Sequence, residues 1–101
     1  MAGQTGFEEL RNVNLEGATI TEHLTDKNAV GRINSSEVCS DGCLRINWRL
    51  QDNGDLSMTL SAKSWQCERT ANAFLLTRIA SDIHPSEAGF FYALRYTIVM
   101  P

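Results

Sequence analysis

Three cysteines are the first residues whose chemistry and spacing could build a site: Cys39, Cys43 and Cys67. With His84 they could supply four zinc ligands, but Cys39 and Cys43 lack the commoner two-residue spacing and no second close pair follows. A small, odd number of cysteines suits a reducing compartment in which thiols stay free. One disulfide with one spare thiol is the alternative. We therefore expect no metal ion and no other cofactor.

Groups that catalyse reactions are sparse in this chain. The two histidines are His23 and His84, and His84 follows an expected helix, where the helix dipole favours a cation. No serine stands in a G-x-S-x-G motif, no glycine loop is suited to phosphate, and no motif pairs two carboxylates. We expect no catalytic residues and no enzyme activity.

Three cations, Arg45, Arg49 and Lys63, fall on the polar face of an expected hairpin. Such a face could bind an anion or a single-stranded nucleic acid. Nucleic-acid binders usually add aromatic side chains on which bases stack, and this face has none. The net charge of −3 is also unlike the basic balance of most such binders. We keep this function as an alternative and do not lead with it.

Aromatic residues are the other candidates for binding. Trp65 falls outside the hairpin's apolar row, so it could anchor a partner or pack against the start of the expected helix. Tyr92 and Tyr96, with Trp48, could line an apolar cavity between sheet and helix. A small apolar ligand in that cavity is the other alternative function.

The positions of most of these side chains depend on an expected β-hairpin around Asp52-Asn53-Gly54-Asp55. Residues 44–50 and 56–62 alternate between apolar and polar side chains, which predicts two strands with one buried face. A two-residue loop would set apolar side chains opposite polar ones, whereas a three-residue loop, 52–54, matches the faces. In that register Leu50 lies opposite Leu56 and Trp48 opposite Met58. Gly54 then needs a positive φ.

The remaining pattern predicts an α+β fold, with an antiparallel sheet of about five strands and one main helix packed on it. Apolar spacings of three and four place this helix at about 68–83, and Pro85 ends it. A strand at 90–99 is apolar on both faces, so it is either central, covered twice or part of an interface. Further expected segments are strands at 18–24 and 29–33, a helical turn at 7–13 and a loop at 35–42.

Length and composition are those of one globular domain, residues 1–101, with 1–6 as a flexible tail. The chain has 101 residues, 43% hydrophobic and 21% charged, which argues against disorder. Arg95 interrupts the longest apolar run, so we expect no membrane span. The first residues show neither a basic region nor an apolar core, so we expect no signal peptide and a cytoplasmic location.

Several short motifs lie in the middle of the chain, in a fixed order. They are Gly42-Cys43, Trp48, Gly54-Asp55-Leu56, Ser64-Trp65-Gln66-Cys67 and Phe74-Leu75. In this order residues 42–80 resemble the core of the META/HslJ-like domain, although Leu44 stands where that family has Asn. The resemblance implies a β-rich, non-enzymatic domain around a helix, found in bacterial envelope and protozoan proteins. It also implies that Cys43 and Cys67 lie close together.

The leading functional expectation is therefore that the chain binds another protein. The strand at 90–99 is the expected surface, and a second copy of the chain, giving a homodimer, is a possible partner.

Overall fold

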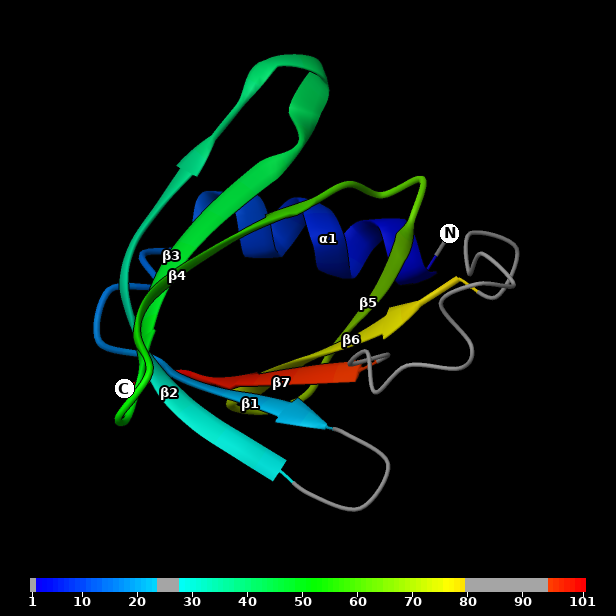
Figure 1. Ribbon diagram of the computed structural model, residues 1–101. Coiled ribbons are helices and arrows are strands. Elements are labelled where there is room, and N and C mark those ends of the chain that lie inside the picture. The colour runs from blue at the N-terminus through cyan, green and yellow to red at the C-terminus, as the bar shows by residue number, and fades with distance from the viewer. Residues whose placement is uncertain (1, 24–27, 80–94) are drawn as a thin grey trace.

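The structure is a curled antiparallel sheet with a helix at its N-terminal end (Figure 1). The computed structural model describes residues 2–23, 28–79 and 95–101. Its elements in these residues are α1 (Ala2–Asn12), β1 (Thr19–His23), β2 (Asn28–Val38), the 3-10 helix η1 (Ser40–Gly42), β3 (Leu44–Leu50), β4 (Gly54–Leu60), β5 (Trp65–Arg69), β6 (Ala73–Arg78) and β7 (Arg95–Val99). The strands form one sheet in the order β4-β3-β2-β1-β7-β6-β5.

The sheet curls because its two edge strands are consecutive in the chain. Only residues 61–64 join β4 to β5. Seven strands in a flat sheet would place these edges about 29 Å apart, at about 4.8 Å per strand. The linker with its flanking bonds spans at most about 18 Å. The sheet therefore bends into a half-barrel, and α1 lies in its concave side (Figure 1).

The core lies between α1 and the concave face of the sheet. Phe7 and Leu10 are three residues apart, so they share one face of α1, and both are buried. They pack with inward-facing apolar side chains of the strands and of the segment after α1. The buried cluster comprises Phe7, Leu10, Leu15, Ala18, Ile20, Ile33, Leu44, Ile46, Trp48, Leu60, Cys67, Phe74, Leu76 and Ile98.

Helix α1 makes its closest approach to the sheet at β5. Gly6 is buried, and a Cβ atom there would lie 2.3 Å from the carbonyl oxygen of Cys67. Glu9 on the same helix accepts a 2.6 Å hydrogen bond from Arg69 of β5. The Arg69 guanidinium also lies over the Phe74 ring, 4.7 Å from its centroid. One backbone contact and one ion pair thus hold α1 against β5.

The sheet and helix differ from the architecture expected from the sequence. The expected sheet of about five strands with a main helix at 68–83 is wrong. The described residues form seven strands, and residues 68–79 contain the end of β5 and all of β6. In β6, Phe74 and Leu76 are buried on the concave side, while Leu75 is half-buried on the other side. When a strand is apolar on both faces, its hydrophobic pattern no longer alternates with a period of two. The apolar residues of β6 therefore matched the spacings of three and four that are typical of a helix.

The helix in the described residues lies instead at the N-terminus. Phe7 and Leu10 point inward, as expected for the helical turn at 7–13. The helix is longer than that turn and begins at Ala2, within the stretch expected to be a tail.

The hairpin of β3 and β4 exists, but its register differs from the expected one by two residues. Leu50 pairs with Gly54 and Trp48 pairs with Leu56, so the loop is 51–53 and not 52–54. A shift of two keeps every side chain on its face, because the period of a strand is two. In β3 the apolar row is buried as expected, except that Leu50 is half-buried. In β4 only Leu60 is buried, while Met58 is half-buried and Leu56 is exposed.

The turn explains this shift. Asp52 has a φ of 69°, a left-handed conformation that Asp tolerates better than most residues. The N–H of Asn53 donates to the carbonyl oxygen of Leu50 at 3.1 Å, which closes the turn earlier than expected. Gly54 has a φ of 77°, which confirms its expected positive value.

Strands β1, β2 and β7 occupy expected strand regions with different bounds. β2 continues to Val38 through an irregularity between Ile33 and Ser35, so the first half of the expected loop at 35–42 is strand. β7 lies between β1 and β6 and is therefore central. Residues 90–94 of the expected strand lie outside the described residues. Both sides of β7 are paired, by β1 and by β6.

We predict that Gly6→Ala destabilises the protein by about 1–2 kcal/mol. Alanine improves helix propensity by about 1 kcal/mol, but the new Cβ would meet backbone at 2.3 Å, so overpacking should cost about 2–3 kcal/mol, the upper part of its usual range. Urea unfolding followed by circular dichroism measures the change. The control Glu68→Ala, at an exposed residue of β5, should shift stability by less than about 0.5 kcal/mol. A Gly6→Ala variant as stable as the parent would contradict this packing.

Candidate functional site

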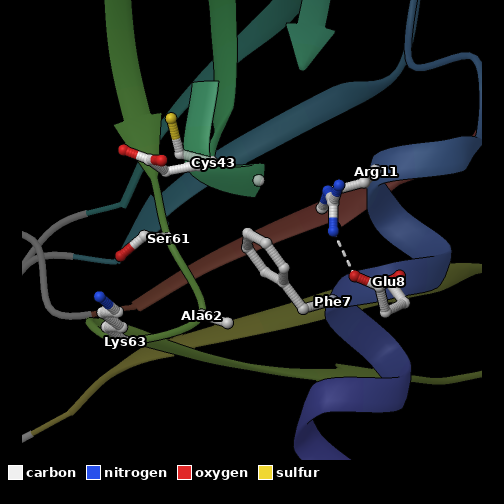
Figure 2. Close-up of a pocket in the computed structure, with 9 residues that line it drawn as sticks. Phe7, Glu8, Arg11, Cys43, Ser61, Ala62 and Lys63 are labelled. Atoms are coloured by element: carbon white, nitrogen blue, oxygen red, sulfur yellow. Dashed lines mark hydrogen bonds and ion pairs between the residues drawn. The ribbon is translucent and has the colours of Figure 1, made fainter. Parts of the chain in front are cut away.

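A half-open pocket of about 370 Å³ lies where three separate segments meet. Phe7, Glu8 and Arg11 come from α1, residues 41–43 come from η1 and the start of β3, and residues 61–63 come from the turn between β4 and β5. Figure 2 shows the Phe7 ring projecting from the helix into the space between these segments. In the same view Lys63 and Arg11 lie on either side of that ring.

The helix wall of the pocket carries a closed ion pair. The guanidinium of Arg11 donates to the carboxylate of Glu8, one turn earlier on α1. Arg11 is mostly buried, and a Cβ atom on Gly42 would sit 3.6 Å from its guanidinium atoms. Gly42 has a φ of 76°, which a glycine adopts without strain. The Nε of Arg11 is buried without a hydrogen-bond partner, so this cation keeps an unused donor.

The loop wall of the pocket is fixed by a disulfide. Cys39 and Cys43 are bonded across η1, with their Cα atoms 5.3 Å apart. The Cys39 N–H also donates to the carbonyl oxygen of Cys43 at 2.9 Å. Between them, Asp41 adopts a left-handed φ of 64°. Cys39 and Cys43, which the sequence offered as metal ligands, are therefore joined by a disulfide. This matches the alternative of one disulfide with one spare thiol.

The spare thiol, Cys67, is buried in the core beneath α1. Burial, and then the negative charge of Glu9, raise the pKa of Cys67 to about 12. A thiol with such a pKa stays protonated at neutral pH and is a poor nucleophile. In the described part of the chain, no three His, Cys, Asp or Glu side chains gather as a metal site would require. His84 lies outside that part.

Two of the three candidate cations have local carboxylate partners. Arg45 donates to Glu37 at 2.9 Å, and Arg49 donates to Asp55 at 3.0 Å. The hydrogen bond and charge of Arg49 lower the pKa of Asp55. Lys63 is not beside these arginines but lines the pocket. The structure therefore does not bring the three cations together as one patch.

The candidate aromatic residues form a cluster on the concave side. The centroid of the Tyr96 ring lies 5.5 Å from the centroid of the Trp65 ring and 6.4 Å from that of the Trp48 ring. The Tyr96 hydroxyl donates to Glu22 at 3.1 Å. Burial, and then the nearby Glu22, raise the pKa of Tyr96. Tyr92 lies outside the described residues.

Two further polar groups bear on the sequence candidates. The Nε1 of Trp48 is buried without a hydrogen-bond partner. His23 contacts Thr97 through Nε2 and Oγ1 at 2.8 Å, a link between β1 and β7. His23 is thus engaged by a neighbouring strand of the sheet.

Sequence reasoning missed most of the pocket. Glu8, Arg11 and Asp41 were not candidates, and Lys63 was chosen for a different face. One signal was present: Asp41-Gly42 between two cysteines is a turn sequence inside a possible disulfide loop. The meeting of that loop with α1 depends on contacts between residues about thirty positions apart.

Comparisons of the chain with family models, with curated proteins and with solved structures found no match. The resemblance to the META/HslJ-like domain therefore stays a prediction. Among the described residues, no helix is both long enough and apolar enough to cross a membrane.

We predict that the native protein shows no reactive thiol at pH 8, because Cys67 is buried with a pKa of about 12. In denaturant without reductant, one thiol should react with Ellman's reagent, and after reduction and removal of the reductant three should react. The variant Cys67→Ala should lose the one thiol seen without reductant. Three reactive thiols in denaturant without reductant would exclude the Cys39–Cys43 disulfide.

Proposed function

We propose that this chain acts by binding another protein and not by catalysing a reaction, and that the free edge of β4 is the binding surface. Within the described residues, β4 pairs with β3 on one side and with no strand on the other. Unpaired backbone N–H and C=O groups along such an edge are a template for one more strand. This unpaired edge is the observation that carries the proposal.

The two edges of the sheet differ in their protection. β5 has α1 packed against it through Gly6 and the Glu9–Arg69 pair. β4 has no Pro, no Lys and no bulge in its pairing with β3, which are features that usually block strand addition. Leu56 in β4 leaves 37% of its surface exposed. These differences favour β4 as the edge that a partner uses.

The partner we favour is a second copy of the chain. When two β4 strands pair antiparallel around Ser57, each Ser57 lies opposite its copy, Leu56 lies opposite Met58, and Asp55 lies opposite Thr59. Apolar side chains then meet on one face, and Asp55, the charged residue of β4, meets a neutral hydroxyl. Pairing about a two-fold axis uses the same edge on both copies and stops at a dimer.

The two alternative functions have less support. An anion or nucleic acid at Arg45 and Arg49 would have to compete with Glu37 and Asp55. A small apolar ligand would need space beside Tyr96, whose ring already packs near those of Trp48 and Trp65. Strand addition at β4 needs no existing contact among the described residues to break.

We predict that Ser57→Lys weakens a dimer, while Thr59→Lys does not. In the proposed register the two lysines introduced by Ser57→Lys would face each other across the two-fold axis, and like charges directly opposite cost up to about 1 kcal/mol. The dissociation constant should rise about fivefold at low salt. The lysine introduced by Thr59→Lys would face Asp55 of the other copy. The dissociation constant of this variant should therefore be equal to that of the parent or lower. Sedimentation equilibrium measures both.

Both substitutions place lysine on the exposed outer face of the same strand, so each controls for the other in net charge. Within the chain Ser57 lies opposite Asn47 and Thr59 lies opposite Arg45, so urea unfolding of both variants checks that each is folded. Raising the salt concentration should bring the dissociation constants of the two variants closer together, because salt screens exposed charges. A parent chain that stays monomeric up to millimolar concentration would refute the homodimer. Equal weakening by both lysines would refute the register.

A further inference from the structure

The η1 loop, residues 39–43, is closed by a disulfide that the fold does little to protect. Cys39 and Cys43 are four positions apart in the chain, and both are half-buried. A short loop removes little conformational entropy from the unfolded chain, so folding favours this disulfide less than one that closes a long loop. Exposure also raises the reduction potential of a disulfide. The Cys39–Cys43 bond is therefore open to reduction in the folded protein.

Two features of the closed η1 loop are unfavourable by themselves. Asp41 has a left-handed φ of 64°, which costs any residue except glycine some free energy, although Asp tolerates it better than most. Gly42 lies against the Arg11 guanidinium, and the Nε of Arg11 is buried without a hydrogen-bond partner in the described structure. A buried donor without an acceptor lacks the hydrogen bond that water would give it. Movement of the loop away from α1 would relieve both costs.

Bonds beside the disulfide limit how far such a movement can spread. The Cys39 N–H donates to the carbonyl oxygen of Cys43 at 2.9 Å, and Val38 pairs with Leu44 at the end of the β2–β3 ladder. Neither contact involves a sulfur atom, so both can persist when the disulfide is broken. The loop thus has a closed arrangement held by a covalent bond and an open one that leaves the sheet intact.

We propose that the Cys39–Cys43 disulfide is a reversible redox switch: the oxidised form holds the η1 loop against Arg11, and the reduced form releases it. The reductant is a dithiol. One of its thiolates attacks the Sγ of one cysteine, the disulfide breaks, and the other cysteine leaves as a thiolate. The second thiol of the reductant then displaces the first cysteine, so the reductant becomes a disulfide. Two electrons and two protons pass to the protein in total.

The third cysteine does not enter this exchange. Cys67 is buried in the core beneath α1, where a reagent does not reach its thiol. Attack of one thiolate on the disulfide therefore leads to reduction of the Cys39–Cys43 pair and not to a rearranged bond with Cys67. The switch has two states, which a thiol count on the native protein can tell apart.

Dithiothreitol is the probe, applied to the full chain without denaturant. After anaerobic removal of the reagent, two thiols should react with Ellman's reagent, while Cys67 stays protected. In ¹H–¹⁵N NMR spectra the signals of residues 39–43 and of Arg11 should move on reduction, and those of β1 and β7 should not. Oxidised glutathione should restore the first spectrum.

The Nε–H of Arg11 reports the opening of the loop directly. In the oxidised protein it is buried, so its exchange with water should be slow. Reduction should make this exchange at least roughly tenfold faster, because water then reaches the donor. Arg45, on the outer face of the sheet, is the matched reference, and its Nε–H should exchange equally fast in both states.

Variants separate the switch from a general loss of stability. The double variant Cys39→Ser and Cys43→Ser should show fast Arg11 Nε–H exchange with or without reductant, whereas Cys67→Ala should keep the switch. Arg11→Met removes the unpaired donor, so its equilibrium constant for oxidation by glutathione should rise roughly tenfold. Arg45→Met is the control for the lost charge and should leave that constant unchanged.

Three results would each overturn the inference. The first is a native disulfide that dithiothreitol leaves intact. The second is a reduction that moves the NMR signals of every strand, because the disulfide would then hold the whole fold and not one loop. The third is an Arg11 Nε–H exchange rate that is the same in the oxidised and the reduced protein.

Discussion

The contact between α1 and the concave side of the sheet is the interaction on which the rest of the structure depends. A four-residue connection brings the edges β4 and β5 toward each other, and the curled sheet then encloses a trough that must be filled. Phe7 and Leu10 fill it, and Gly6 lets the helix approach the backbone of β5. Without the helix, the apolar row beneath it would face water.

The same contact creates the pocket and leaves one edge of the sheet open. Helix α1 lies against β5, and its residues Phe7, Glu8 and Arg11 meet the η1 loop and the β4–β5 turn at the pocket. On the other edge of the sheet, β4 keeps an unpaired side in the described structure. One edge is therefore protected by packing, and the other has no structural feature against strand addition among the described residues. The pocket and the unpaired edge are supplied by different residues.

On the outer surface, Arg45 and Arg49 are paired with carboxylates close to them. Arg45 and Arg49 each meet a carboxylate on a neighbouring strand, and exposed pairs of this kind contribute little stability. They do, however, remove the cationic patch that residue types alone suggested. Asp41 and Lys63, which line the pocket, are exposed and have no ion-pair partner among the described residues.

The sequence by itself determined the β3–β4 hairpin, the buried row around Trp48 and the inward face of Phe7 and Leu10, because covalent geometry sets the periods of strands and helices. Tertiary structure alone decided the rest. Residues 73–76 are apolar on both faces, so only their neighbours β5 and β7 make them strand. Of the pocket, the sequence singled out Cys43 and Lys63 as candidates but not their setting, because the helix, the disulfide loop and the turn that meet there are distant in the chain.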